Sequence, residues 1–99
     1  MIVKRRMTGV EIVAWARSQA DLPEALRLAG AEMAAAVAAY HQAQIPYRLG
    51  GIDRKTKQRK RYYDTRTPEG ARVAKAGKLL GELEYEARRR AHIATFGGA

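Results

Sequence analysis

A strongly basic stretch, residues 47–78, separates two segments of helical periodicity and constrains the fold of this chain more than any other feature. It holds eleven Lys or Arg residues and three acidic ones, a net charge of +8, whereas the whole 99-residue chain carries +9. Nearly all of the excess charge therefore lies in one third of the sequence. We interpret the flanking helical segments as the scaffold and the basic stretch as the functional part.

The first helix is predicted over residues 8–20, after an extended lead at residues 1–7. Thr8 and Glu11 form the pattern of a capping box, in which each side chain accepts a hydrogen bond from a free backbone N–H of the first turn. Trp15 is the largest apolar side chain of the chain, and burial statistics favour a place in the core. Stacking on a nucleobase and insertion into a partner protein are the alternatives for Trp15.

The second helix is predicted over residues 21–44. Asp21 is placed to cap it, and Pro23 is tolerated in its first turn. Pro46 ends the helix, because the residue before a proline avoids helical geometry. Apolar residues recur along this segment at spacings of three and four, which is the pattern of a helix with one buried stripe.

The third helix is predicted over residues 68–95, with Thr67 as its cap and Pro68 at the first helical position. Its apolar stripe is narrow, and the sequence leaves open whether the helix is continuous through Gly77 and Gly81, since glycine weakens a helix interior. Two acidic residues of this helix are followed four residues later by arginine, which predicts ion pairs on the helix surface. These pairs are Glu84–Arg88 and Glu86–Arg90.

Between the last two helices lies the basic arm, residues 47–67. Gly50 and Gly51 predict a turn or hinge. Residues 52–63 are compatible with a two-stranded ribbon that turns near residues 55–57, but the turn lacks the Asn-Gly pair typical of a hairpin. An irregular basic loop is therefore the alternative to a short β-ribbon.

The predicted fold class is mainly α: three helices, with a basic loop or short β-ribbon between the second and the third, in one helical domain over residues 1–99. There is no cysteine, so disulfides and thiolate metal sites are excluded. No apolar run approaches the ~20 residues that cross a bilayer, and we expect neither a signal peptide nor a membrane location. Residues predicted to pack the helices, or subunits, together are Trp15, Leu22, Leu26, Met33, Val37, Tyr40, Leu80 and Leu83.

The sequence contains no pattern that indicates catalysis, a metal site or a cofactor site, so we predict that the protein is not an enzyme and has no small-molecule substrate. The basic arm has two interpretations: a solvated loop that keeps an oligomer soluble, or an arm that binds polyanions with a steep salt dependence. Tyrosines beside arginines add stacking surface for bases. The candidate contact residues are Arg48, Arg54, Lys55, Lys57, Arg59, Lys60, Arg61, Tyr62, Tyr63 and Arg66.

Up to Gly51 the layout resembles the small tail-completion and minor tail proteins at the neck of long-tailed phages. The resemblance is carried by a capped short helix, by the Leu-Pro pair at residues 22–23 that opens an Ala-rich helix, and by residues 45–50, Ile-Pro-Tyr-Arg-Leu-Gly. It implies a structural subunit of a phage particle's head–tail or tail region, in the virion or the host cytoplasm. Its partners would be other protein subunits, as a homo-oligomer or a larger assembly.

The order helix, helix, basic arm, helix also resembles the bacterial histone-like DNA-bending proteins, with a similar segment at residues 73–80. This second resemblance implies binding to DNA or RNA. We therefore expect a non-enzymatic assembly subunit whose arm contacts an acidic neighbour or DNA; the alternative is a small nucleic-acid-binding protein without sequence preference.

Overall fold

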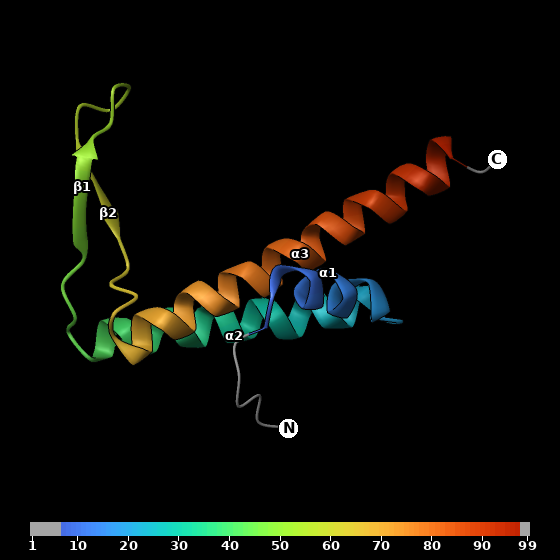
Figure 1. Ribbon diagram of the computed structural model, residues 1–99, viewed down its shortest axis with the longest axis horizontal. Coiled ribbons are helices and arrows are strands. Elements are labelled where there is room, and N and C mark those ends of the chain that lie inside the picture. Colours follow the sequence, from blue (N-terminus) through green and yellow to red (C-terminus); the bar gives the residue numbers. More distant parts are fainter. Residues whose placement is uncertain (1–6, 98–99) are drawn as a thin grey trace. The chain divides into compact units, whose positions relative to one another are not determined.

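The computed structural model describes residues 7–97 and contains three helices and one β-hairpin (Figure 1). The prediction of a mainly α fold with a short ribbon between the second and third helices is confirmed, and the irregular loop is not formed. The predicted lead at residues 1–7 falls almost wholly outside the described residues. In chain order the elements are α1 (Gly9–Ser18), α2 (Leu22–Gln42), β1 (Arg48–Ile52), β2 (Arg59–Tyr62) and α3 (Pro68–Phe96).

Local capping fixes where the helices begin. Thr8 and Glu11 form the predicted capping box: the Thr8 hydroxyl accepts from the Glu11 N–H at 3.2 Å, and the Glu11 carboxylate accepts from the Thr8 N–H at 3.3 Å. The Asp21 carboxylate accepts from the backbone of the first turn of α2 at 3.1 Å. These side chains satisfy N–H groups that have no partner within a helix. The third helix, α3, is one element that continues through Gly77 and Gly81.

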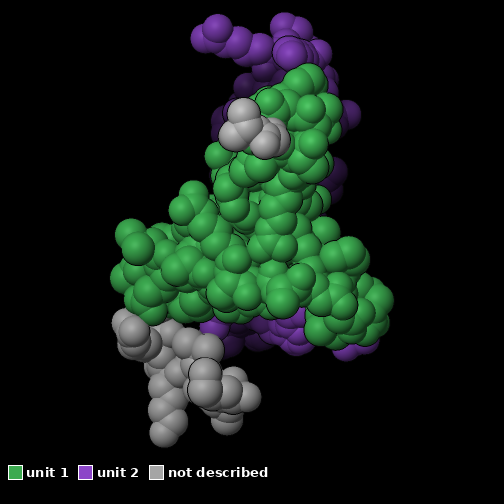
Figure 2. Space-filling model, turned by 90° about the vertical axis from the view of Figure 1, so that its right-hand side faces the viewer, with its two compact units in different colours: residues 1–30, 78–99 green, residues 31–77 purple. Residues whose placement is uncertain are grey.

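The described residues form two compact units, one of residues 7–30 and 78–97 and the other of residues 31–77 (Figure 2). We call them unit 1 and unit 2. The core of unit 1 consists of buried Ala16, Leu22 and Leu83, with Trp15 and Leu26 packed against them. Of the residues predicted to pack helices together, Leu80 is half-buried and belongs to the same unit.

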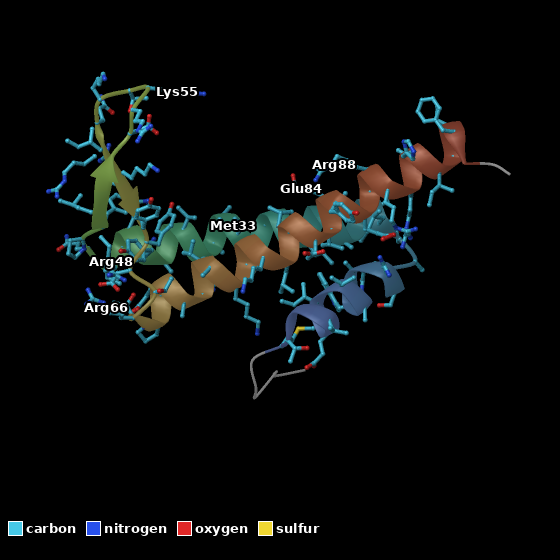
Figure 3. All side chains as sticks on the ribbon, turned by 45° about the horizontal axis from the view of Figure 1, so that its top comes forward. Met33, Arg48, Lys55, Arg66, Glu84 and Arg88 are labelled. Carbon is cyan, nitrogen blue, oxygen red and sulfur yellow. The ribbon has the colours of Figure 1, made fainter. Side chains whose placement is uncertain are left out.

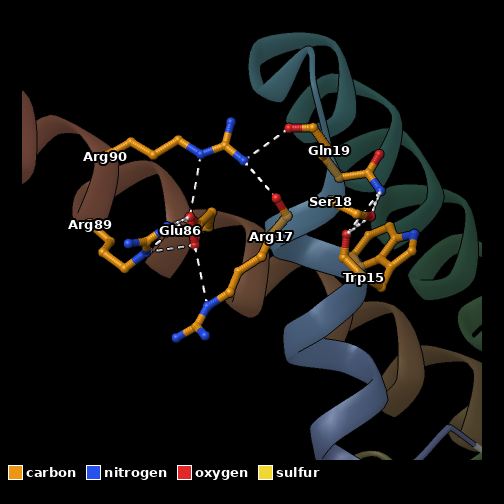
Figure 4. Close-up of polar contacts among 7 residues, drawn as sticks. All are labelled: Trp15, Arg17, Ser18, Gln19, Glu86, Arg89 and Arg90. Atoms are coloured by element: carbon orange, nitrogen blue, oxygen red, sulfur yellow. Dashed lines mark hydrogen bonds and ion pairs between the residues drawn. The ribbon is translucent and has the colours of Figure 1, made fainter.

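Unit 1 also contains a buried carboxylate. Glu86 is only 1% exposed, and Arg89 donates to its two oxygens at 2.6 to 3.0 Å (Figure 4). Arg90 lies 3.3 Å and Arg17 3.9 Å from the carboxylate. The hydrogen bonds from Arg89 hold the pKa of Glu86 below its ordinary value of 4.5. The predicted Glu86–Arg90 pair therefore exists, but its acidic member is buried among three guanidinium groups and is not on the surface.

Unit 2 carries the arm on a second core. Ala36 and Tyr40 of α2 and Val73 and Ala76 of α3 are buried, and the partly buried residues around them include Met33 and Val37. Two parallel hydrogen bonds at 2.8 Å join Arg72 to Glu32 across the helices. The side chains just before β1 and just after β2, Ile45, Tyr47 and Tyr63, pack on the same core.

Candidate functional site

The basic arm, residues 47–67, is built on an antiparallel hairpin of β1 and β2. Arg48 pairs with Tyr62, Leu49 with Arg61, and Ile52 with Arg59. Cross-strand partners point to the same face of a ribbon. One face therefore carries Arg48 and Tyr62, and the other carries Leu49 and Ile52 together with two arginines. Every residue of both strands is exposed except Gly50, which is half-buried.

The hairpin turns without an Asn-Gly pair because Asp53 organises the loop. Its carboxylate accepts hydrogen bonds from the N–H groups of Lys55, at 2.7 Å, and Thr56, at 3.1 Å. Its backbone N–H donates to Gln58 and its carbonyl accepts from Lys57, at 2.8 and 2.9 Å. Lys57 takes a positive φ of 61°, which closes the loop. Aspartate side chains commonly stabilise turns in this way.

Gly50 and Gly51 do not form the predicted turn or hinge. Both lie within β1, where the register shifts between Leu49 and Ile52. A Cβ atom at residue 50 would lie 2.6 Å from Cε2 of Tyr62, so the tyrosine ring occupies the space that a side chain there would need. Gly50 therefore allows the Tyr62 ring to lie close to the backbone of β1. The residues next to Gly50 in the sequence do not indicate this contact.

The base of the arm is fixed to both helices of unit 2. The Tyr40 hydroxyl donates to the Pro46 carbonyl and accepts from the Asp64 N–H, each at 2.9 Å. The Thr67 hydroxyl, at the start of α3, donates to the Asp64 carbonyl at 2.6 Å. A side chain at Gly70 would collide with that same carbonyl. The chain is consequently held in place on both sides of the hairpin, just before β1 and just after β2.

Seven cationic side chains of the arm form no ion pair with a carboxylate among the described residues, although the charge of Arg48 helps to lower the pKa of Asp64. Within residues 7–97 their side chains make no ion pair and no hydrogen bond. Figure 3 shows Lys55 at the turn and Arg48 near the base of the hairpin. Arg61 lies over the ring of Tyr47, 5.9 Å from its centre. All seven residues are exposed: Arg48, Arg54, Lys55, Lys57, Arg59, Lys60 and Arg61.

Arginines outside the hairpin strands and loop behave differently, because most of them are paired with acids. Arg27 binds Glu24, and Arg72 binds Glu32. Arg66, the last predicted contact residue, donates to both oxygens of Asp64 at 2.9 Å. These hydrogen bonds, together with the charges of Arg66 and Arg48, lower the pKa of Asp64 from 3.8 to about 2. The unpaired arginines of the arm are therefore not a general property of this basic chain.

The two predicted stacking tyrosines occupy different environments. Tyr62 is 50% exposed on β2. Tyr63 is half-buried and its ring centre lies 4.9 Å from that of Tyr40 and 5.5 Å from that of Tyr47. Only Tyr62 presents an open ring beside the unpaired cations. The packing of Tyr40 was predicted from the sequence, but the hydrogen bonds of its hydroxyl and the role of Asp53 in the turn were not. The spacing from Asp53 to Thr56 is a local signal for a turn.

The arm presents an exposed cationic surface. Among residues 7–97 no three His, Cys, Asp or Glu side chains gather as metal ligands. No helix in this part of the chain is long and apolar enough to span a membrane. Comparisons with protein-family models, with curated proteins and with solved structures found no match.

Proposed function

We propose that this protein is a non-enzymatic binding protein whose arm attaches to the phosphate backbone of nucleic acid without sequence preference. The observation that carries the proposal is the set of seven exposed cations on one hairpin, none of which forms an ion pair within residues 7–97. When such cations bind phosphates, the nucleic acid releases its condensed counterions, which favours the complex. No ion pair within the described residues has to be broken first. The helices provide a body that fixes the arm at its base.

The absence of sequence preference follows from the kind of side chains in the arm. Phosphate contacts position a protein on nucleic acid, whereas contacts to base edges specify sequence. Arg54, Lys55 and Lys57, which are exposed on the hairpin loop, serve the first purpose. Nonspecific binding of this type has dissociation constants of about 1–100 µM at physiological salt.

A salt titration of binding tests the proposal. The logarithm of the association constant for duplex DNA should fall with the logarithm of salt concentration, with a slope no steeper than about 6 if all seven cations contact phosphates. Replacing Arg54, Lys55 and Lys57 with Gln should reduce the slope by up to about 2.7, since each lost contact contributes ~0.9. The loop is held by Asp53 and backbone groups, so this triple variant should keep its fold.

The matched control removes the same charge elsewhere. Lys75, Lys78 and Arg88 are exposed on α3 and lie outside the arm. Their replacement with Gln should leave the slope within about 0.9, one contact, of the unmodified protein. Equal effects of the two triple variants would show that only net charge matters and would contradict a role for the arm.

A second candidate function is a structural subunit of a phage particle's head–tail or tail region, with the arm against an acidic protein neighbour. Exposed apolar side chains in unit 1 favour it: Val10 is 81% and Phe96 76% exposed. Val10 and Val13 also line an open hollow on α1. Self-association of the isolated protein in sedimentation, with no affinity for nucleic acid at physiological salt, would support this candidate and exclude the first.

A further inference from the structure

One face of the hairpin carries Tyr62 between two cationic residues. Arg48 is the direct cross-strand partner of Tyr62, and Lys60 lies two residues before it on the same strand. Residues two apart on a strand share a face, about 7 Å from each other. The Tyr62 ring is thus flanked by two cationic residues, one on each strand, and neither forms an ion pair among the described residues.

Gly50 lies beneath this ring. The positions that a Cβ at residue 50 would contact are Cε2 and Cδ2 of Tyr62, at 2.6 and 3.5 Å, and Cβ of Lys60, at 3.5 Å. Because residue 50 has no side chain, the Tyr62 ring lies against β1 in the space that a side chain would fill. Half of Tyr62 remains open to solvent.

The remaining tyrosines near the arm are not available for a ligand in this way. Tyr40 is fully buried, and the rings of Tyr47 and Tyr63 pack on it and on each other. Those rings hold the base of the arm. Tyr62 has no ring partner among the described residues, and its hydroxyl group makes no hydrogen bond there.

We propose that Tyr62 is a stacking site for an unpaired base, with Arg48 and Lys60 holding the adjoining phosphates, so that the arm prefers single-stranded over double-stranded nucleic acid. This inference rests on the proposed function and names the nucleic acid that the arm takes. An aromatic ring stacks on any base, since every base has a π-face, and so sequence independence is retained. In a duplex the faces of the bases are already covered by their neighbours, and a base must be unstacked before its face is exposed.

The test measures the affinity of the full chain for an oligothymidylate of about 16 nucleotides, the upper site size of a compact single-strand binder, and for a duplex of the same length. Tyr62→Ile removes the ring and keeps a residue that favours a strand. It should weaken single-strand binding about 5- to 150-fold, the range measured for one base–aromatic stack, and leave duplex binding unchanged. Tyr62→Phe should retain single-strand binding within about twofold, because the ring is kept.

Tyr85→Ile is the matched control, because Tyr85 is 56% exposed on α3 and lies outside the arm. It should change neither affinity. The stacking inference is wrong if Tyr62→Ile leaves the single-strand affinity unchanged, or weakens single-strand and duplex affinity equally. The proposed function still stands in that case, provided that the triple variant of Arg54, Lys55 and Lys57 weakens binding. If the unmodified protein binds neither ligand, both are wrong. Circular dichroism of each variant verifies that the helices are intact.

Discussion

The backbone N–H of Asp64 donates a hydrogen bond to the hydroxyl group of Tyr40, 24 residues earlier, at 2.9 Å. The same hydroxyl donates to the carbonyl of Pro46 at 2.9 Å. One buried side chain of α2 thereby holds the chain just before β1 and just after β2. The arm is positioned by this hydroxyl, while its charged strands and loop extend from that point.

Tyr40→Phe removes the hydroxyl and keeps the ring. It leaves the Pro46 carbonyl and the Asp64 N–H without their partner, and we expect a loss of about 1–3 kcal/mol in the free energy of unfolding, the usual cost of leaving buried polar groups unpaired. Urea denaturation measures this loss. Tyr63→Phe is the control, because within residues 7–97 the Tyr63 hydroxyl makes no hydrogen bond. The free energy of unfolding of this variant should equal that of the unmodified protein. An equal loss in both variants would contradict the role of the Tyr40 hydroxyl.

The pair of Asp64 and Arg66 predicts a specific loss of stability in acid. The hydrogen bonds from Arg66 lower the pKa of Asp64 from 3.8 to about 2 in the folded protein. A carboxyl group with a lowered folded-state pKa stabilises the fold fully above its unfolded value, and this contribution disappears as the pH falls through the folded value. The difference in melting temperature between the unmodified protein and Asp64→Asn should therefore be constant above about pH 5 and shrink toward pH 2. A constant difference down to pH 2 would contradict the shift.

Those parts of the fold that depend on neighbouring residues could be predicted from the sequence. Thr8 with Glu11, and Thr67 with Pro68, act within one helical turn, so their spacing is sufficient to place the starts of α1 and α3. The cationic residues of the arm were likewise evident, because their exposure follows from their charge.

Contacts between distant residues could not be predicted in this way. Tyr40 reads as one more member of an apolar stripe until the fold brings Asp64 to its hydroxyl. Tyr62 and Tyr63 are adjacent, but Tyr62 at the end of β2 remains half exposed, whereas Tyr63, just after the strand, packs on the rings of Tyr40 and Tyr47. Glu86 matches the pattern of a surface ion pair, and its burial depends on packing that spacing alone does not contain.

The burial of Glu86 predicts unequal effects of two similar substitutions. Glu86→Gln removes the charge that faces Arg17, Arg89 and Arg90, and leaves these three guanidinium groups close together without a counter-charge. The melting temperature should fall clearly. Glu84→Gln, two residues earlier and exposed, should change it little. Thermal unfolding by circular dichroism compares the two, and equal melting temperatures would show that the buried ion pairs contribute no net stability.

Gly50 and Gly51 provide a matched test of the ring position on the hairpin. A methyl group at residue 50 would lie 2.6 Å from Cε2 of Tyr62, whereas one at residue 51 would meet nothing within 4 Å. Neither glycine has a positive φ, so the difference between the two alanine variants reports on space and not on backbone strain. Gly51→Ala should leave the protein unchanged or stabilise it by about 0.4–1 kcal/mol, because alanine restricts the unfolded chain.

Gly50→Ala must move the Tyr62 ring off the strand, and we expect a changed chemical shift of its ring protons. Single-strand affinity should fall toward that of Tyr62→Ile, with duplex affinity retained. If Gly50→Ala and Gly51→Ala have the same ring shifts and the same affinity, the ring does not depend on Gly50 for its position.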